Sequence, residues 1–223
     1  MTQEMLLQPL KCSACGANLG VAPGQVLAAC GFCHAGYEVL GTNPVGFSQA
    51  LAVTDDRPAL LLPFWLVRFD VHLRGFSCTS PNKVSPYKET QPGPADQADE
   101  LYARLDGSRQ TMLIAAFRAN NFINYTADLS LEITRRWDEP RLVKPDHAMP
   151  WPLCHYDHLD ARKIASVLLK VKVNKDVGEI VGLEFDAEWK EHRLIWWPFA
   201  EDGDFWRDMK YGERILKSAL PAA

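Results

Sequence analysis

The amino-acid sequence predicts an α+β protein, with an antiparallel sheet and a few helices that follow a small cysteine-rich module. Three observations support this prediction. Polar and apolar residues alternate in some segments, apolar residues recur every four positions in another, and two Cys-x-x-Cys pairs lie near the N-terminal end. Alternation is typical of a strand with one buried face, whereas the four-residue recurrence is typical of an amphipathic helix. At 223 residues the chain can form one domain plus a small module.

The cysteines form two pairs, Cys12 with Cys15 and Cys30 with Cys33. A Cys-x-x-Cys turn points both sulfurs to the same side, and four thiolates fill the tetrahedral shell that Zn²⁺ prefers. A glycine lies within or directly after each pair, where the backbone must turn tightly. The spacing therefore predicts one metal site made by both pairs.

This pattern, with predicted strands at 26–29 and 36–40, resembles the zinc ribbon family. That family is a small three-stranded module found in transcription-initiation factors, in polymerase subunits and in many bacterial proteins of unassigned role. The resemblance covers residues 8–45 and implies a single zinc ion bound by the four cysteines. Two departures are visible: His34 stands where many ribbons have glycine, and neither pair has the common proline. His34 is therefore an alternative ligand in place of Cys33.

Other uses of the four cysteines remain open. A redox dithiol needs one pair whose thiolate is stabilised by a helix start or by positive charge, and neither pair has that setting. An iron centre uses the same four thiolates, and disulfides are the third alternative. Because four ligands leave no position for an activated water, the metal is expected to be structural. Its binding, on the order of 10–16 kcal/mol for zinc peptides, would supply most of the module's stability.

Charge is distributed unevenly over the chain, whose formal net charge is −4. Between Cys12 and Thr54 the one charged residue is Glu38. A ribbon that binds phosphates needs lysines and arginines, so this one is expected to pack on a protein, either its own second domain or a partner. The one basic stretch is interrupted by acids and is interpreted as a solvated face. Its basic residues are Arg135, Arg136, Arg141, Lys144, Arg162, Lys163, Lys170, Lys172 and Lys175.

No segment predicts a membrane span or a secretory leader. The longest apolar block, 59–67, contains a proline and is far shorter than the about 20 residues that a span needs. The first eleven residues lack both a charged leader and a long apolar run. The chain is therefore expected to be cytoplasmic, where paired cysteines are more often metal ligands than disulfides.

The larger domain is expected to span 55–223, after a linker rich in turn residues at 41–58. It is expected to begin with a strand over 64–73, followed by a long proline-rich loop at 77–110 that is either functional or disordered. The other predicted elements are a strand at 111–117, helices at 124–137 and 158–171, a strand at 182–190, a turn at 191–193 and a strand at 194–199. The second helix is expected to be capped by Asp157 or Asp160, and its end could equally be a strand.

Three groups of residues outside the cysteine pairs suggest chemistry. They are the cluster Cys154, His155 and His158, the acids Glu184, Asp186 and Glu188, and the single residues His72 and Cys78. The cluster could bind a second metal ion but lacks a fourth well-spaced ligand. The acids and His72 are expected on the solvated side of a sheet, and a lone cysteine is more often inert than nucleophilic. No phosphate loop, nucleophile elbow or dinucleotide fingerprint is present in the sequence.

These observations favour a non-enzymatic adaptor or assembly component, in which the ribbon docks on another protein. Nucleic-acid binding is the first alternative, and it requires the basic stretch to lie on one face beside the ribbon. An enzyme is the second alternative, and it requires a pocket in which the His–Cys cluster or the acids converge. The sequence leaves the oligomeric state open.

Overall fold

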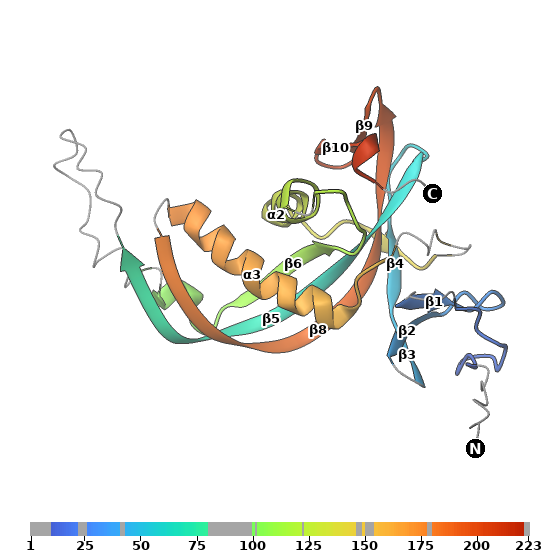
Figure 1. Cartoon of the computed structure of the whole chain (residues 1–223), viewed down its shortest axis with the longest axis horizontal. Helices are drawn as coiled ribbons and strands as arrows, with labels where there is room; N and C mark the ends of the chain where they lie inside the picture. The colour runs from blue at the N-terminus through green and yellow to red at the C-terminus, as the bar shows by residue number, and fades with distance from the viewer. Residues whose placement is uncertain are drawn as a thin grey trace, which may run out of the picture.

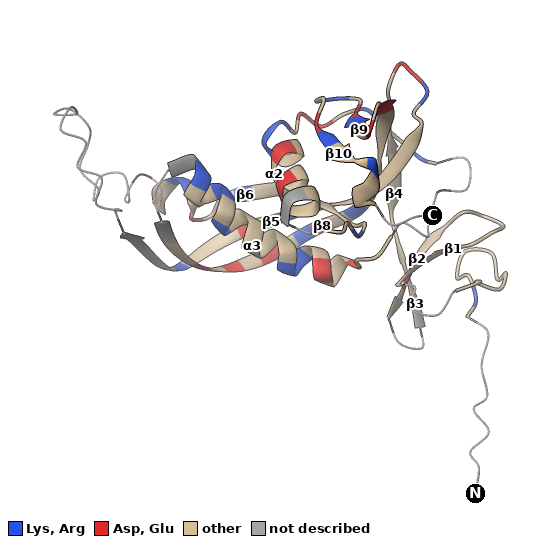
Figure 2. Ribbon diagram, turned by 45° about the horizontal axis from the view of Figure 1, so that its top comes forward, with Lys and Arg blue, Asp and Glu red and all other residues tan. Residues whose placement is uncertain are grey.

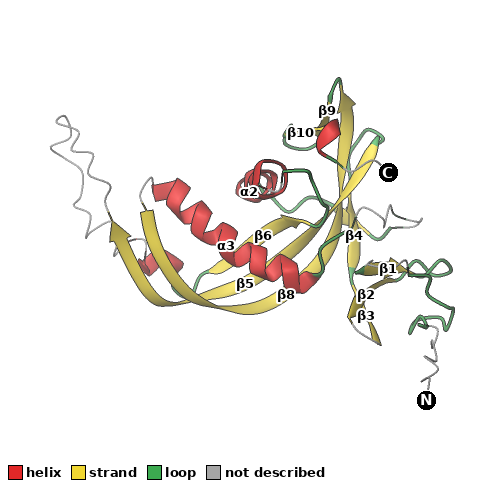
Figure 3. Cartoon of the chain, in the orientation of Figure 1, coloured by secondary structure: helices red, strands yellow, loops and turns green. Residues whose placement is uncertain are grey.

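The computed structural model describes residues 10–21, 26–40, 43–79, 100, 102–121, 123–145, 149, 154–177 and 180–220. The fold is α+β, as predicted, with a three-stranded antiparallel sheet near the N-terminal end and a larger mixed sheet against which the helices pack (Figure 1, Figure 3). Over the described residues, none of the helices combines the length and the apolar character that crossing a membrane requires.

The small sheet contains β1 (Leu27–Ala29), β2 (Gly36–Leu40) and β3 (Asn43–Phe47), with β2 in the centre. The first two strands are confirmed, but β3 lies in the segment that was predicted as a linker. That prediction fails because Pro44 and Gly46 occupy an edge strand, where a proline removes no needed hydrogen bond. We call the described residues from Leu10 to Phe47 the N-terminal module.

The larger sheet begins one residue after β3. Strand β4 (Gln49–Ala52) runs parallel to β8 (Ile180–Asp202), so the chain passes from one sheet to the other without a flexible spacer. The long strands β5 (Leu60–Thr79) and β8 pair antiparallel along almost their whole length and form a strongly curved two-stranded ribbon (Figure 1). The shorter strands are β6 (Arg109–Ala115), β7 (Leu142–Val143), β9 (Phe205–Asp208) and β10 (Arg214–Leu216).

The predicted turn at 191–193 is wrong, because β8 is continuous through it. Its partner β5 pairs Arg68 with Glu191 and Phe69 with Trp189, so Lys190 forms a β-bulge between them. Before the bulge one face of β8 is polar. After residue 193 both faces are buried, and the apolar run continues the same strand between two layers of core.

Helix α3 (His158–Val177) lies along the concave side of the curved β5–β8 ribbon (Figure 1). The predicted helix at 158–171 is confirmed, and its end is helical rather than extended. Asp157 caps it by accepting the N–H of Asp160 at 2.8 Å. The buried residues of α3, which pack against odd-numbered residues of β5, are Ala161, Ala165, Leu168, Leu169 and Val173.

Helix α2 (Asp128–Arg135), preceded by the π-helical turn η1 (Ile123–Ala127), covers the free edge of β6. The Ser130 hydroxyl accepts the Ala115 N–H at 3.0 Å, and the Thr134 hydroxyl accepts the Leu113 N–H at 2.9 Å. These bonds satisfy edge donors that would otherwise be exposed to pairing with another strand. The predicted helix at 124–137 is thus confirmed in its centre.

The segment predicted as a loop at 77–110 is shorter than expected at both ends. Strand β5 runs to Thr79 and β6 begins at Arg109, with a helical turn before it that includes residues 102–105. Residues 80–99 lie outside the described residues. The division into domains at 8–45 and 55–223 remains a prediction.

Candidate metal centre

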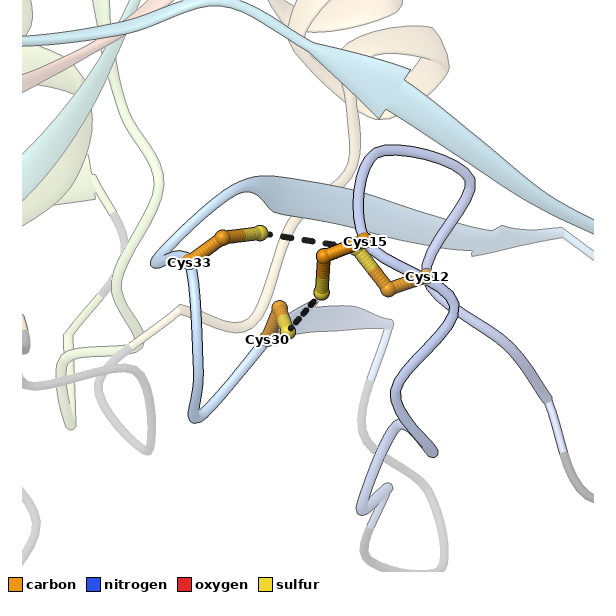
Figure 4. A group of neighbouring side chains, drawn as sticks. All are labelled: Cys12, Cys15, Cys30 and Cys33. Atoms are coloured by element: carbon orange, nitrogen blue, oxygen red, sulfur yellow. Dashed lines mark hydrogen bonds between the residues drawn. The ribbon is translucent and has the colours of Figure 1, made fainter.

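Four sulfur atoms from two loops converge in the N-terminal module (Figure 4). The Sγ atoms of Cys12, Cys15, Cys30 and Cys33 all lie within 4.8 Å of one another. The Cys12–Cys33 and Cys15–Cys30 Sγ pairs are each 3.5 Å apart. Four sulfurs bound at about 2.3 Å to one tetrahedral ion are about 3.8 Å apart, so this group could hold one metal ion.

The two loops, which we call the first knuckle (residues 12–16) and the second knuckle (residues 30–34), share one backbone pattern. The N–H of Gly16 donates to the Cys12 carbonyl at 2.8 Å, and the N–H of His34 donates to the Cys30 carbonyl at 3.0 Å. Gly16 and His34 both have positive φ, at 76° and 59°. The structure brings Cys33 rather than His34 into the sulfur group, so His34 serves the turn and not the ligand set.

Tyr37 of β2 is a residue of the site that sequence reasoning missed. Its side chain is 2% exposed, and its hydroxyl lies 3.0 Å from Cys12 Sγ. The same hydroxyl accepts the Ala14 N–H at 3.2 Å and lies 3.2 Å from the Ser13 hydroxyl. The Tyr37 hydrogen bond is the main reason why the pKa of Cys12 falls to about 6, which favours the thiolate that a metal requires.

The second knuckle also stabilises a thiolate. The Phe32 N–H points at Cys30 Sγ, 3.4 Å away. Hydrogen bonds from the backbone N–H groups of Cys33 and Phe32 lower the pKa of Cys30, against the opposing effect of burial. Each knuckle thus has one buried cysteine whose pKa is lowered by hydrogen bonds to its sulfur.

The N-terminal module packs on the larger sheet through its one acidic residue. Glu38 is 1% exposed and accepts the His158 N–H at 2.8 Å through Oε1, while its Oε2 pairs with His158 Nδ1. The Phe47 ring meets the Trp65 ring edge-on, with centroids 5.1 Å apart. The side-chain amide of Gln49, in β4, donates to the His34 carbonyl of the second knuckle at 2.7 Å. The expectation that the uncharged module packs on a protein surface is therefore met by its own chain.

The cluster of Cys154, His155 and His158 does not form a second site. Among the residues that the structure describes, the four cysteines are the one group of His, Cys, Asp or Glu that could hold a metal. Cys154 is buried, which raises the pKa of its thiol well above the ordinary value and leaves it inert. His158 is held by Glu38 instead.

The acids of β8 lie on the solvated face, as predicted. Asp186 forms an ion pair with Arg74 at 3.1 Å, and Glu188 lies 3.6 Å from His72. These partners are half-exposed or more. Cross-strand pairing of this kind is typical of the wet side of a sheet. Cys78 lies in β5 opposite Val181, and its side chain lies outside the described residues.

The basic residues of 135–175 are spread over the end of α2, the segment that follows it and α3 (Figure 2). Arg136 forms an ion pair with Glu213 at 3.0 Å, and Lys175 pairs with Asp128 at 3.1 Å. Lys175 lies near the end of α3 that points away from the N-terminal module (Figure 1). The basic residues are therefore not all gathered beside the cysteine site.

Three comparisons with known proteins found no match for this chain. No family model matches the chain, no curated protein matches it, and no solved structure matches it. The site therefore has to be interpreted from its own geometry.

Proposed function

We propose that Cys12, Cys15, Cys30 and Cys33 bind one structural Zn²⁺ ion, and that the protein is a non-enzymatic adaptor or assembly component. The convergence of four sulfurs in the N-terminal module supports this proposal. Iron accepts the same ligands, but Zn²⁺ is the usual ion of paired knuckles with four cysteines. Four protein ligands leave no position for substrate or water, so the ion's role is to hold the module together.

An adaptor role is supported by the part of the module that its own larger sheet leaves uncovered. Phe32, at the tip of the second knuckle, is 83% exposed. The first knuckle presents exposed Ser13 and Ala14, and the module's one acid is buried against His158. An exposed aromatic side chain on a rigid, uncharged turn suits a protein surface with an apolar pocket.

The proposal assigns the protein to a compartment that keeps thiols reduced, such as the cytoplasm. The four cysteines are free in the structure, and oxidation to disulfides would remove the ligands.

Elemental analysis of the native protein tests the proposed zinc site, and a matched pair of variants tests the proposed adaptor role. We expect about one zinc per chain, and less in Cys33→Ser. Phe32→Ser should abolish co-purification of a defined partner from the native host, whereas Val167→Ser, which removes another exposed apolar residue from α3, should not. Equal recovery of partners by both variants would contradict the adaptor role while leaving the zinc site intact.

A further inference from the structure

We propose that metal binding at the four cysteines is coupled to the contacts that hold the N-terminal end of α3 in place. Two neighbouring residues of β2, Tyr37 and Glu38, carry this coupling. This inference rests on the proposed metal site and adds a consequence for the larger sheet. The N-terminal module would then be a cooperative part of the whole fold rather than an independently folding unit.

The first half of the connection is Tyr37. Neighbouring side chains of a strand point to opposite faces, so Tyr37 and Glu38 lead away from β2 in opposite directions. The Tyr37 hydroxyl makes its three polar contacts with the first knuckle, at Cys12, Ser13 and Ala14. The second knuckle leads directly into β2. Both halves of the metal site therefore fix the position of this strand.

The second half is Glu38. Its carboxylate accepts the backbone N–H of His158, the first residue of α3, and pairs with the His158 ring. The first N–H groups of a helix have no partner within it, and negative charge is favoured there. Glu38 thus completes a helix start from a position 120 residues earlier in the chain.

The helix start that Glu38 holds is joined to the centre of the larger sheet. The Trp65 indole N–H donates to the Tyr156 carbonyl at 2.8 Å, just before α3. The His158 ring stacks on the His192 ring of β8, with centroids 4.5 Å apart and planes 15° apart. A shift of Glu38 would therefore disturb contacts that reach both β5 and β8.

Loss of metal should displace Glu38. The buried cluster of the metal site contains two of the four cysteines but only two other buried side chains, Leu19 and Tyr37, which is too little to hold the two knuckles together by apolar contacts alone. Leu27 of β1 and Phe47 of β3 pack on the larger core, so the loss falls on the knuckles and on β2 between these strands. If β2 loosens, the carboxylate leaves its helix start, and the His158 N–H and ring lose their buried partner. The free-energy cost of leaving the His158 N–H and ring unpaired opposes metal loss. This cost is the coupling between the metal site and the start of α3.

Hydrogen exchange on the full-length protein, loaded with zinc or treated with a chelator, measures this coupling. Chelation should accelerate exchange at 158–162 by about 5- to 150-fold, the range of ordinary coupling energies. Exchange in α2, whose Ser130 and Thr134 hydroxyls bond to β6, serves as the internal reference. A loss of protection confined to the N-terminal module, or one equal at α2 and at the start of α3, would overturn the proposal.

Because the coupling is reciprocal, a second measurement can be made on zinc affinity instead of on hydrogen exchange. Glu38→Ala should weaken zinc affinity, measured by competition with a chromogenic chelator, by at least about fivefold. Glu188→Ala is the matched control, since Glu188 pairs with His72 on the exposed face of β8. Unchanged zinc affinity in Glu38→Ala would refute the coupling but not the metal site. A wild-type chain that binds no zinc would refute the metal site itself, and the coupling with it.

Discussion

Gly16 and His34 occupy equivalent positions, each directly after the second cysteine of its knuckle, and both have a left-handed backbone. Their N–H groups donate to the carbonyls of Cys12 and Cys30 in the same way. Glycine adopts this conformation freely, whereas another L-residue in it costs about 1–2 kcal/mol. The second knuckle therefore has a strained residue at the position where the first has none.

The first prediction concerns this pair of turns. Gly16→Ala should lower the free energy of unfolding of the zinc-loaded protein by about 1–2 kcal/mol. His34→Gly should raise it by up to about 1 kcal/mol, since relief of strain exceeds the added entropy of the unfolded chain. Gly20→Ala is the control, because Gly20 does not have a left-handed φ and an added Cβ there meets nothing within 4 Å. Denaturant titration measures all three, and equal costs for Gly16→Ala and Gly20→Ala would contradict the account.

The second prediction concerns the hydroxyl beside the metal ligand. Tyr37→Phe keeps the buried ring but removes the hydrogen bond to Cys12 and the acceptor of the Ala14 N–H. Removal of a partner that orients a metal ligand typically weakens metal affinity by about 10- to 100-fold. Competition with a chelator of known affinity checks this value, with Tyr125→Phe as a control in a different apolar cluster. An affinity equal to that of the wild type would exclude the hydroxyl from the site.

The third prediction concerns the turn after β9. Asp208 is 1% exposed, and its carboxylate accepts the Trp197 indole N–H and the backbone N–H groups of Lys210 and Tyr211. Asp208→Ala leaves these donors unpaired, each at a cost of about 1–3 kcal/mol where it stays buried. The variant should be destabilised by at least about 3 kcal/mol in thermal or denaturant unfolding. A loss comparable to that of Asp204→Ala, in the β8–β9 turn, would show that the bonds contribute little.

The fourth prediction is a dependence of stability on pH that arises at His192. Burial, with the positive charges of His158 and Arg162, lowers the pKa of His192 from 6.5 to about 4, against a smaller opposing effect of Glu191. Between these values the unfolded chain binds more protons than the native one. The free energy of unfolding therefore falls as the pH decreases from 6.5 to 4. After allowance for solvent screening at this half-buried ring, the loss should be about 1–2 kcal/mol.

Denaturant titration across that pH range checks the fourth prediction by comparing variants. Burial raises the pKa of Glu38, which contributes with the opposite sign, so the wild-type curve alone does not isolate His192. His192→Asn should remove part of the decline, and His72→Asn, on the exposed face, should not. Identical slopes for the wild type and His192→Asn would contradict the assignment.

Local patterns were enough to predict the cysteine group and several elements. The ligands of a knuckle are three residues apart, so their convergence needs only a tight turn that the sequence itself specifies. The alternation around Trp65 and the recurrence from Ala161 to Leu168 likewise report which face each element buries. These predictions depend on neighbours in the chain and not on the rest of the fold.

Tertiary relationships were not predictable in this way. Glu38 was visible as the module's one acid, but its burial depends on His158, 120 residues away. The polar triplet 191–193 looks like a turn, whereas in the folded protein Glu191 pairs with Arg68 and His192 stacks on His158. Polar residues stay in this strand because partners from other elements satisfy them, and no local pattern reveals such partners.

The most direct test of the account is X-ray absorption at the zinc edge on the purified native protein, together with its Cys33→Ser variant. We predict about one zinc per chain, with four sulfur neighbours at about 2.3 Å in the wild type and three in the variant. A protein without bound metal, or a metal with fewer than four sulfur neighbours in the wild type, would contradict the closed four-cysteine site.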